Sequence, residues 1–137
     1  MPRVRVTRRL HFAAAHRLSR AEWTPEHNRA VFGLCANENW HGHNYELDVT
    51  VEGEVDPQTG FVLDLKDLRL LVEKSVIEDL DHRNLNIDVP WLADIIPTTE
   101  NLVVAIWNRI VDRLPAGVAL HRLVLWETPR NYVEYQG

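Results

Sequence analysis

The segment HGHNYELDVTVE, residues 41–52, limits the fold more strongly than any other part of the chain. Alternate positions carry two histidines followed by aromatic and aliphatic residues, while the positions between them are mostly polar or charged. This alternation is typical of a β-strand with one buried and one solvated face. The buried set is His41, His43, Tyr45, Leu47, Val49 and Val51, and the solvated set is Asn44, Glu46, Asp48, Thr50 and Glu52. Two histidines therefore leave the same face of a sheet as its core residues.

An earlier segment alternates in the same way, and it predicts the first strand. Its apolar side carries Val4, Val6, Leu10 and Phe12, and its polar side carries Arg3, Arg5, Thr7, Arg9 and His11. Residues 17–40 lose all periodicity. We expect a long loop there, which in a compact domain is either functional or disordered.

Two later segments have helical spacing. The first carries its apolar stripe from Leu65 to Leu80, with Asp64 placed to cap its start, and the second runs from about Thr98 to a stop at Pro115 and Gly117. Strands are predicted over 118–127 and 131–136. The order β-β-α-α-β-β predicts one α+β domain over residues 1–137, with a four-stranded sheet and two helices. Such a sheet has two open edges, so we expect the chain to oligomerise through them.

Composition excludes several classes of protein. The formal net charge of −5 argues against a general nucleic-acid binder. No apolar run approaches the roughly 20 residues of a membrane helix, and the N-terminus predicts a strand in place of a signal peptide. A single cysteine cannot form an intrachain disulfide. We therefore expect a cytoplasmic protein with neither nucleic-acid nor membrane partners.

The paired histidines predict a metal site. His41 and His43 lie two residues apart on one strand face, with Cα atoms about 6.6 Å apart, and can share one ion. Phe12, Ala14 and His16 continue the inward parity of the first strand, which pairs with the second because consecutive strands usually do. His16 is therefore the predicted third ligand. The alternative is that both histidines are simply polar residues at the start of a strand. A lone histidine usually has this structural role, but two histidines on one strand face fit it less well.

The single cysteine, Cys35, has three interpretations. As a fourth ligand it would close a structural zinc site, whereas three histidines alone leave a position for substrate or water. As a thiol near Zn²⁺ but not bound to it, it would have a depressed pKa and could act as a general base. A lone cysteine is more commonly a small buried apolar residue. Its polar loop beside the histidines favours the role of a base.

Several polar residues have both a structural and a functional interpretation. Asp81 and His82 could form a proton relay or simply end the first helix, and local pattern does not decide between these. Glu127 ends an apolar strand and could accept two parallel N–H bonds from an amidine-like edge, or be an ordinary charge at a strand end. Thr98 and Thr99 could hold a polar ligand, although capping of the second helix is the commoner use.

Taken together, these segments resemble the 6-pyruvoyl-tetrahydropterin synthase family over nearly the whole chain. The combination of HGHNY with an upstream HFxAxH and a downstream LDH is specific. The resemblance rests on HFAAAH (11–16), FGLCANENWHGHNY (32–45), GEVDPQTGFVLDLKDL (53–68), LDHRNL (80–85), PTTENLVVAIW (97–107) and WET (126–128).

The resemblance implies a tunnelling fold: an antiparallel four-stranded sheet with two helices on one face, three copies of which close a barrel. Two trimers would stack as a homohexamer with sites at subunit interfaces. It also implies zinc ligands at His16, His41 and His43, a catalytic Cys35, a pterin anchor at Glu127 and ring contacts from Thr98 and Thr99. Asp81 and His82 would act from a neighbouring subunit.

The implied reaction converts 7,8-dihydroneopterin triphosphate to 6-pyruvoyl-tetrahydropterin with elimination of triphosphate, and Arg17, Arg20 or Arg29 would contact the triphosphate. The nearest alternative is 6-carboxytetrahydropterin synthase of the queuosine pathway, whose members typically have three residues between the cysteine and HGH. The five residues ANENW found here favour the pyruvoyl enzyme. A different class of alternative is a non-catalytic oligomeric module stabilised by zinc.

Overall fold

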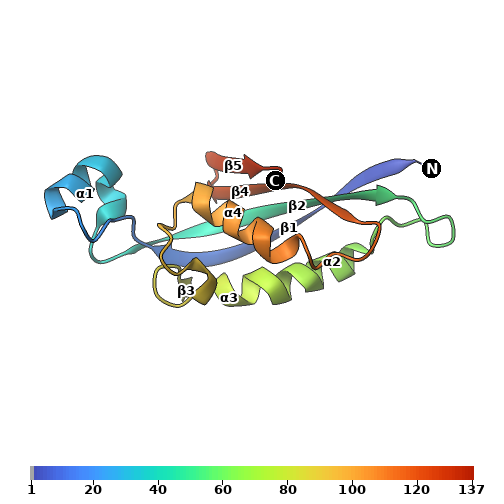
Figure 1. Ribbon diagram of the computed structural model, residues 1–137, viewed down its shortest axis with the longest axis horizontal. Helices are drawn as coiled ribbons and strands as arrows, with labels where there is room; N and C mark the ends of the chain where they lie inside the picture. The colour runs from blue at the N-terminus through green and yellow to red at the C-terminus, as the bar shows by residue number, and fades with distance from the viewer. Residues whose placement is uncertain (1) are drawn as a thin grey trace.

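A computed structural model describes residues 2–137 (Figure 1). In chain order the elements are β1 (Arg3–His16), α1 (Pro25–Phe32), η1 (Gly33–Ala36), β2 (His41–Glu54), α2 (Leu65–Val72), η2 (Glu73–Ile77), α3 (Glu78–Leu80), β3 (Arg83–Asn84), η3 (Pro90–Leu92), α4 (Thr99–Ile110), β4 (Ala119–Thr128) and β5 (Asn131–Tyr135).

The sheet has five strands in the order β3-β1-β2-β4-β5. The pairs β1–β2, β2–β4 and β4–β5 are antiparallel, as expected, but β3 runs parallel to β1. The prediction of four strands was therefore incomplete, and the sheet is mixed. The two residues of β3 are too few to produce a sequence period.

Residues just before β3 explain why it joins the sheet. The carboxylate of Asp81 accepts a hydrogen bond from the backbone N–H of Ala13, and the N–H of His82 donates to the carbonyl of Ala13. His82 has a φ of 61°, a left-handed conformation that reverses the chain at the end of α3. These contacts fix the segment after α3 against the edge of β1.

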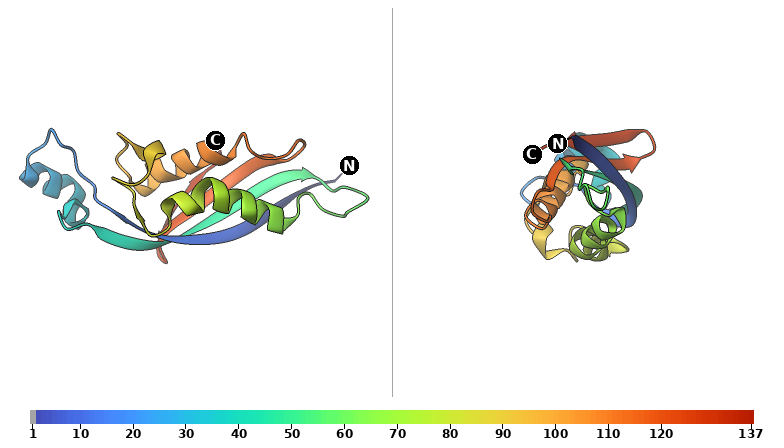
Figure 2. Two further views of the ribbon diagram at one scale, coloured as in Figure 1. Left: turned by 90° about the horizontal axis from the view of Figure 1, so that it is seen from below. Right: turned by 90° about the vertical axis from the view of Figure 1, so that its right-hand side faces the viewer.

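One face of the sheet is covered by α4 and by the continuous run of α2, η2 and α3 (Figures 1 and 2). Asp64 caps α2 as predicted, since its side chain accepts from the N–H of Lys66. The run contains a wider, π-helical turn at η2. The second predicted helix begins as expected with Thr98 as N-cap, but α4 ends at Ile110, and residues 111–114 form turns before Pro115.

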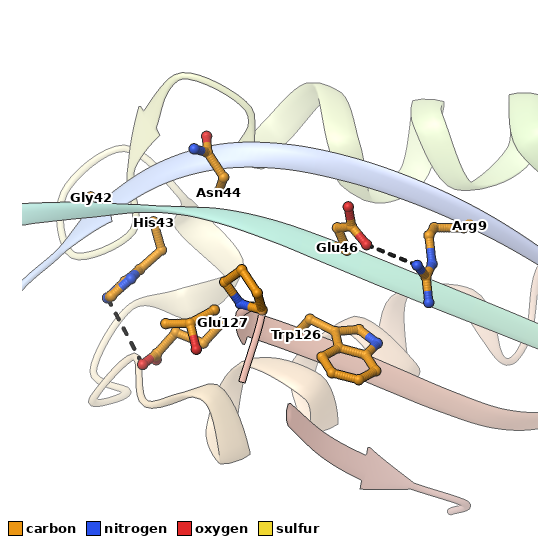
Figure 3. Close-up of a pocket in the computed structure, with 9 residues that line it drawn as sticks. Arg9, Gly42, His43, Asn44, Glu46, Trp126 and Glu127 are labelled. Carbon is orange, nitrogen blue, oxygen red and sulfur yellow. Dashed lines mark ion pairs between the residues drawn. The ribbon is translucent and has the colours of Figure 1, made fainter. Parts of the chain in front are cut away.

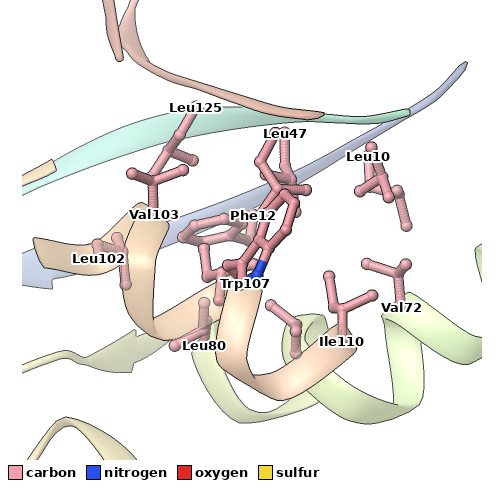
Figure 4. Packing of buried hydrophobic residues seen from close by; sticks show 14 of the residues in the cluster. Leu10, Phe12, Leu47, Val72, Leu80, Leu102, Val103, Trp107, Ile110 and Leu125 are labelled. Carbon is pink, nitrogen blue, oxygen red and sulfur yellow. The ribbon is translucent and has the colours of Figure 1, made fainter. Parts of the chain in front are cut away.

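The core lies between this helical layer and the inward face of the sheet (Figure 4). Tyr45, Leu47, Val49 and Val51 of β2 are all fully buried, as their alternation predicted. Thr50, expected on the solvated face, is buried as well and shares a hydrogen bond with the hydroxyl of Thr7. Phe12 stacks on Tyr45 with ring centroids 4.8 Å apart. Such a pair contributes about 0.5–1.5 kcal/mol beyond the burial of its area.

Residues 17–40, predicted as a loop, contain the short helix α1 and the turn η1. Thr24 caps α1, Pro25 occupies its first turn, and Gly33, with a φ of 61°, follows its end. Asn28 is the buried residue of this helix, so no apolar stripe marked it in the sequence. α1 protrudes at the end of the long axis opposite the N-terminus (Figure 1). Within residues 2–137, no helix has the length and apolarity needed to cross a membrane.

Candidate metal and substrate site

Three histidines meet where β1 ends and β2 begins. The register of the two strands places His16 directly opposite His41, and His43 leaves the same face two residues further along. One potential ligand atom from each ring lies within 4.8 Å of the others. The Nε2 atoms of His16 and His41 are 2.9 Å apart, and the three rings stand at steep angles to one another. The predicted triad is therefore assembled within one chain.

The surroundings of His16 prepare it to bind a cation. This side chain is fully buried, and its Nδ1 lies 2.8 Å from the carbonyl oxygen of Pro97. Because a carbonyl only accepts, Nδ1 carries the proton and the lone pair of Nε2 faces the other two histidines. Burial is the main cause that lowers the pKa of His16 and of His41. Both rings are thus held in the neutral form that binds metals.

The triad fits a divalent cation by a further criterion. His41 Nδ1 and His43 Nε2 are buried without a hydrogen-bond partner among residues 2–137. The nearest acid to His43 is Glu127, with 3.9 Å between Nε2 and a carboxylate oxygen, and the two side chains point toward one another (Figure 3). A cation held by three nitrogens at about 2.0–2.1 Å would occupy the lone pair of His43 Nε2.

Cys35 lies in η1 and is not part of the cluster formed by the three histidines. Its carbonyl accepts from the N–H of Leu18, which ties η1 to the chain just after β1. Burial raises the pKa of the Cys35 thiol, and the nearby carboxylate of Glu127 raises it further. The groups of the chain itself therefore oppose ionisation of this thiol. The lowered pKa that we expected near a bound cation remains a prediction.

A cavity of about 290 Å³ brings Cys35 together with three other predicted site residues, Thr98, Thr99 and Glu127. Glu127 accepts a short hydrogen bond from the hydroxyl of Thr99, and Thr98 also caps α4. The remaining lining residues are Leu18, Glu100, Asn131, Tyr132 and Val133. Glu127 and the backbone after β4 thus form one wall, and the start of α4 forms another.

Glu127 also lines a larger neighbouring cavity of about 620 Å³ together with His43 (Figure 3). Residues of β1, β2 and the end of β4 form its walls, among them Arg9, Asn44, Glu46 and Trp126. A carboxylate shared by two cavities and facing His43 can hold a polar ligand beside the histidine triad.

Asp81 and His82 do not line the cavity that contains Cys35. A carboxylate oxygen of Asp81 lies 3.0 Å from His82 Nδ1, so the predicted pair is formed, and the His82 side chain is 84% exposed. The hydrogen bond from the backbone N–H of Ala13 is the main cause that lowers the pKa of Asp81, and the hydrogen bond with His82 lowers it further. His82 lines a third, open cavity of about 530 Å³ beside β3. Within one chain, therefore, the Asp81–His82 pair and the thiol of Cys35 do not line the same cavity.

The three candidate arginines separate into two groups. Arg17 and Arg29 line one polar cavity of about 390 Å³ with Glu26 and Glu38. Arg20 instead pairs with Glu22 and lies over the ring of Trp23 at 5.5 Å. Arg17 and Arg29 are thus the two candidates that share a cavity, and Arg20 lies outside it.

The sequence did not indicate two contributions to the site. One is the carbonyl of Pro97, a backbone group that no side-chain pattern predicts. The other is Asn131 and Tyr132, which line the Cys35 cavity from the start of β5. Glu127 could have indicated Asn131 and Tyr132, because it points inward just before a turn. Such a turn folds the next strand back beside the residue that precedes it.

Comparison with known proteins agrees with this geometry. The sequence model described as 6-pyruvoyl tetrahydropterin synthase matches residues 5–137. The chain is 48% identical over 132 residues to the 6-pyruvoyl tetrahydrobiopterin synthase of Pongo abelii, covering 96% of this chain and 90% of that protein. It is 38% identical over 134 residues to a dihydroneopterin monophosphate aldolase of Pyrococcus furiosus, covering 98% of each.

The solved structure of Caenorhabditis elegans 6-pyruvoyl tetrahydropterin synthase superposes with a TM-score of 0.91 at 37% identity, covering 100% of this chain and 97% of that one. Similarity in sequence and in fold extends over the full set of elements that build the site. This chain belongs to the 6-pyruvoyl tetrahydropterin synthase family.

Proposed function

We propose that this protein is an enzyme that converts 7,8-dihydroneopterin triphosphate to 6-pyruvoyl-tetrahydropterin, with elimination of triphosphate. The observation that carries the proposal is the cavity shared by Cys35, Thr99 and Glu127, whose carboxylate faces the histidine triad through His43. Membership of the family supports the same reaction.

Glu127 anchors the pterin. Its carboxylate accepts N–H bonds from the amino-pyrimidine edge of the ring, and the hydroxyl of Thr99 fixes the orientation of that carboxylate. Thr98 lies beside them at the same wall of the cavity. Glu127 and His43 line the same cavity, which brings the pterin anchor and the histidine triad to one substrate.

His16, His41 and His43 would hold a zinc ion. When bound, zinc supplies a Lewis acid that polarises the hydroxyl oxygens of the substrate side chain. Cys35 removes a proton from an adjacent C–H bond, and the Asp81–His82 pair transfers protons during loss of triphosphate and the internal redox rearrangement. Arg17 and Arg29 are the chain's candidates for the triphosphate.

The open edges of the sheet support an oligomer. Its edges, β5 on one side and β3 with β1 on the other, remain open in a single chain. Three copies joined edge to edge would close a barrel, which removes the exposed edges, and two such trimers would stack as a hexamer. A cytoplasmic location remains a prediction from the composition and the N-terminal pattern of the sequence.

One specific observation favours a second candidate function. The similar protein of Pyrococcus furiosus is named as an aldolase for dihydroneopterin monophosphate. An aldolase would break a carbon–carbon bond within the side chain and leave a shortened side chain on the pterin, whereas the proposed lyase retains all its carbons. The carboxy-forming sibling enzyme would release acetaldehyde.

The test is incubation of the zinc-loaded protein with 7,8-dihydroneopterin triphosphate and, separately, the monophosphate, with products identified by mass spectrometry. We expect 6-pyruvoyl-tetrahydropterin and triphosphate from the first substrate. A carboxypterin with acetaldehyde, or a shortened side chain, would replace our proposal by the corresponding alternative.

Cys35→Ala separates catalysis from a structural zinc module. We expect this variant to retain bound zinc and its oligomeric state while turnover falls by about 100- to 10,000-fold, the contribution typical of a general base. If Cys35 were a fourth structural ligand, the same variant would lose zinc and unfold. Metal content and size-exclusion chromatography distinguish these outcomes.

A further inference from the structure

The segment just before α4 is held by a side chain inside that helix. The Nδ2 of Asn101 donates to the carbonyl of Ile96 at 2.9 Å. The N–H of Thr98 donates to the same carbonyl at 2.8 Å. Two donors from the C-terminal side thus converge on one oxygen, and Pro97 lies in the chain between Ile96, which accepts, and the two residues that donate.

The turn fixed in this way presents one group to the histidine triad. Pro97 has no N–H of its own, and its carbonyl accepts from Nδ1 of the fully buried His16 at 2.8 Å. That bond determines which nitrogen of His16 carries the proton. The geometry of His16 therefore depends on a loop that Asn101 ties down.

The side chain of Asn101 is not needed to cap α4. Thr98 caps the helix by accepting from the backbone N–H of Asn101 at 3.1 Å, and any residue except proline at position 101 supplies that N–H. The amide group points instead to Ile96, which lies outside the helix. Removing it breaks the tie to the loop and leaves the cap in place.

We propose that Asn101 is a positioning residue for the metal site: its amide holds the Ile96–Thr98 turn so that the Pro97 carbonyl keeps His16 in the Nδ1–H tautomer, with Nε2 free for the metal. The inference rests on the proposed metal role of the histidines. Partners that orient a ligating histidine typically change metal affinity by about 10- to 100-fold when lost.

Asn108 offers a matched control. It lies seven residues further along α4, on the same exposed side of the helix as Asn101. Its side chain makes no hydrogen bond with any of residues 2–137. Asn108→Ala therefore changes helix propensity and surface polarity as Asn101→Ala does, without touching the loop.

The first measurement is zinc affinity by competition with a chromogenic chelator. We expect Asn101→Ala to weaken binding about tenfold and Asn108→Ala to leave it within twofold of the parent. The second is the tautomer of His16 in the ¹⁵N-labelled, metal-free protein, read from long-range ¹H–¹⁵N correlations at pH 7.5. We expect a pure Nδ1–H form in the parent and a mixture of tautomers in Asn101→Ala.

Unchanged affinity together with an unchanged tautomer in Asn101→Ala would overturn the inference and leave Asn101 a stabilising residue only. If Asn101→Ala does not fold, Asn101→Asp decides, because it keeps size and cap but turns an acceptor toward the Ile96 carbonyl. It should show the same two changes. If His41→Ala binds zinc as tightly as the parent, the proposed metal role fails, while the tautomer still tests Asn101.

Discussion

At the scale of single residues, burial of the histidine triad couples stability to pH. Burial lowers the pKa of His16 and of His41 in the folded chain, whereas in the unfolded chain both have a pKa of about 6.5. Between these values the unfolded state binds more protons. The contribution of these rings to the free energy of unfolding is therefore complete above about pH 6.5. It is lost as the pH falls through the lower pKa values of the folded chain.

We thus expect the free energy of unfolding of the metal-free protein to fall between pH 7 and pH 5, as measured by urea denaturation. His41→Gln should show a shallower slope over this range, because one of the two titrating rings is gone. With zinc bound the fall should be steeper, since protons compete with the metal. A parent and a His41→Gln variant with equal slopes would contradict this assignment.

Thr99 acts through Glu127, and its contribution can be isolated. Thr99→Val keeps the shape of this buried side chain but removes the hydroxyl that donates to the carboxylate. Hydrogen bonds to charged groups contribute about 1.5–3 kcal/mol, so we expect kcat/KM for the pterin substrate to fall by about 10- to 100-fold. Thr99→Ser retains the donor and should lose far less. Equal losses in both variants would show that packing, rather than the hydroxyl, matters here.

At the scale of elements, the start of α2 tests a feature distant from the chemistry. The carboxylate of Asp64 accepts from the N–H of Lys66 at 2.9 Å. We expect Asp64→Ala to lower the free energy of unfolding by about 1 kcal/mol and to leave activity unchanged. Asp67→Ala, in the same first turn but without such a bond among residues 2–137, should cost only a few tenths of that amount. A greater loss in the second variant would contradict the role of Asp64 as N-cap.

Elements with a strong period were predictable, and the others were not. β2 alternates over its whole length and α4 carries a continuous stripe, so both were located from the sequence. α1 has one buried side chain, Asn28, and β3 has two residues, so neither could produce a period. Strand parity likewise identified His16 as the partner of His41, whereas the Pro97 carbonyl could not be inferred, because its position depends on a loop that follows no period.

At the scale of the whole molecule, the Cys35 cavity and the Asp81–His82 pair lie at opposite edges of the sheet. The Cys35 cavity is lined by Asn131 to Val133, at the β5 edge. The Asp81–His82 pair adjoins β3, at the other edge, with His82 largely exposed. Joining chains head to tail brings the β3 edge of one copy to the β5 edge of the next. The ring would thereby complete each site with the pair of a neighbour.

Mixed assemblies test this arrangement. We expect Cys35→Ala and His82→Ala to be nearly inactive when each is assembled alone. When equal amounts are co-expressed, a site is complete only where Cys35 comes from one variant and His82 from the other. Random assembly gives this combination at about a quarter of the sites, so about a quarter of the parent activity should return. If each chain used its own His82, every site in the mixture would lack one group, and the activity would stay at the level of the separate variants.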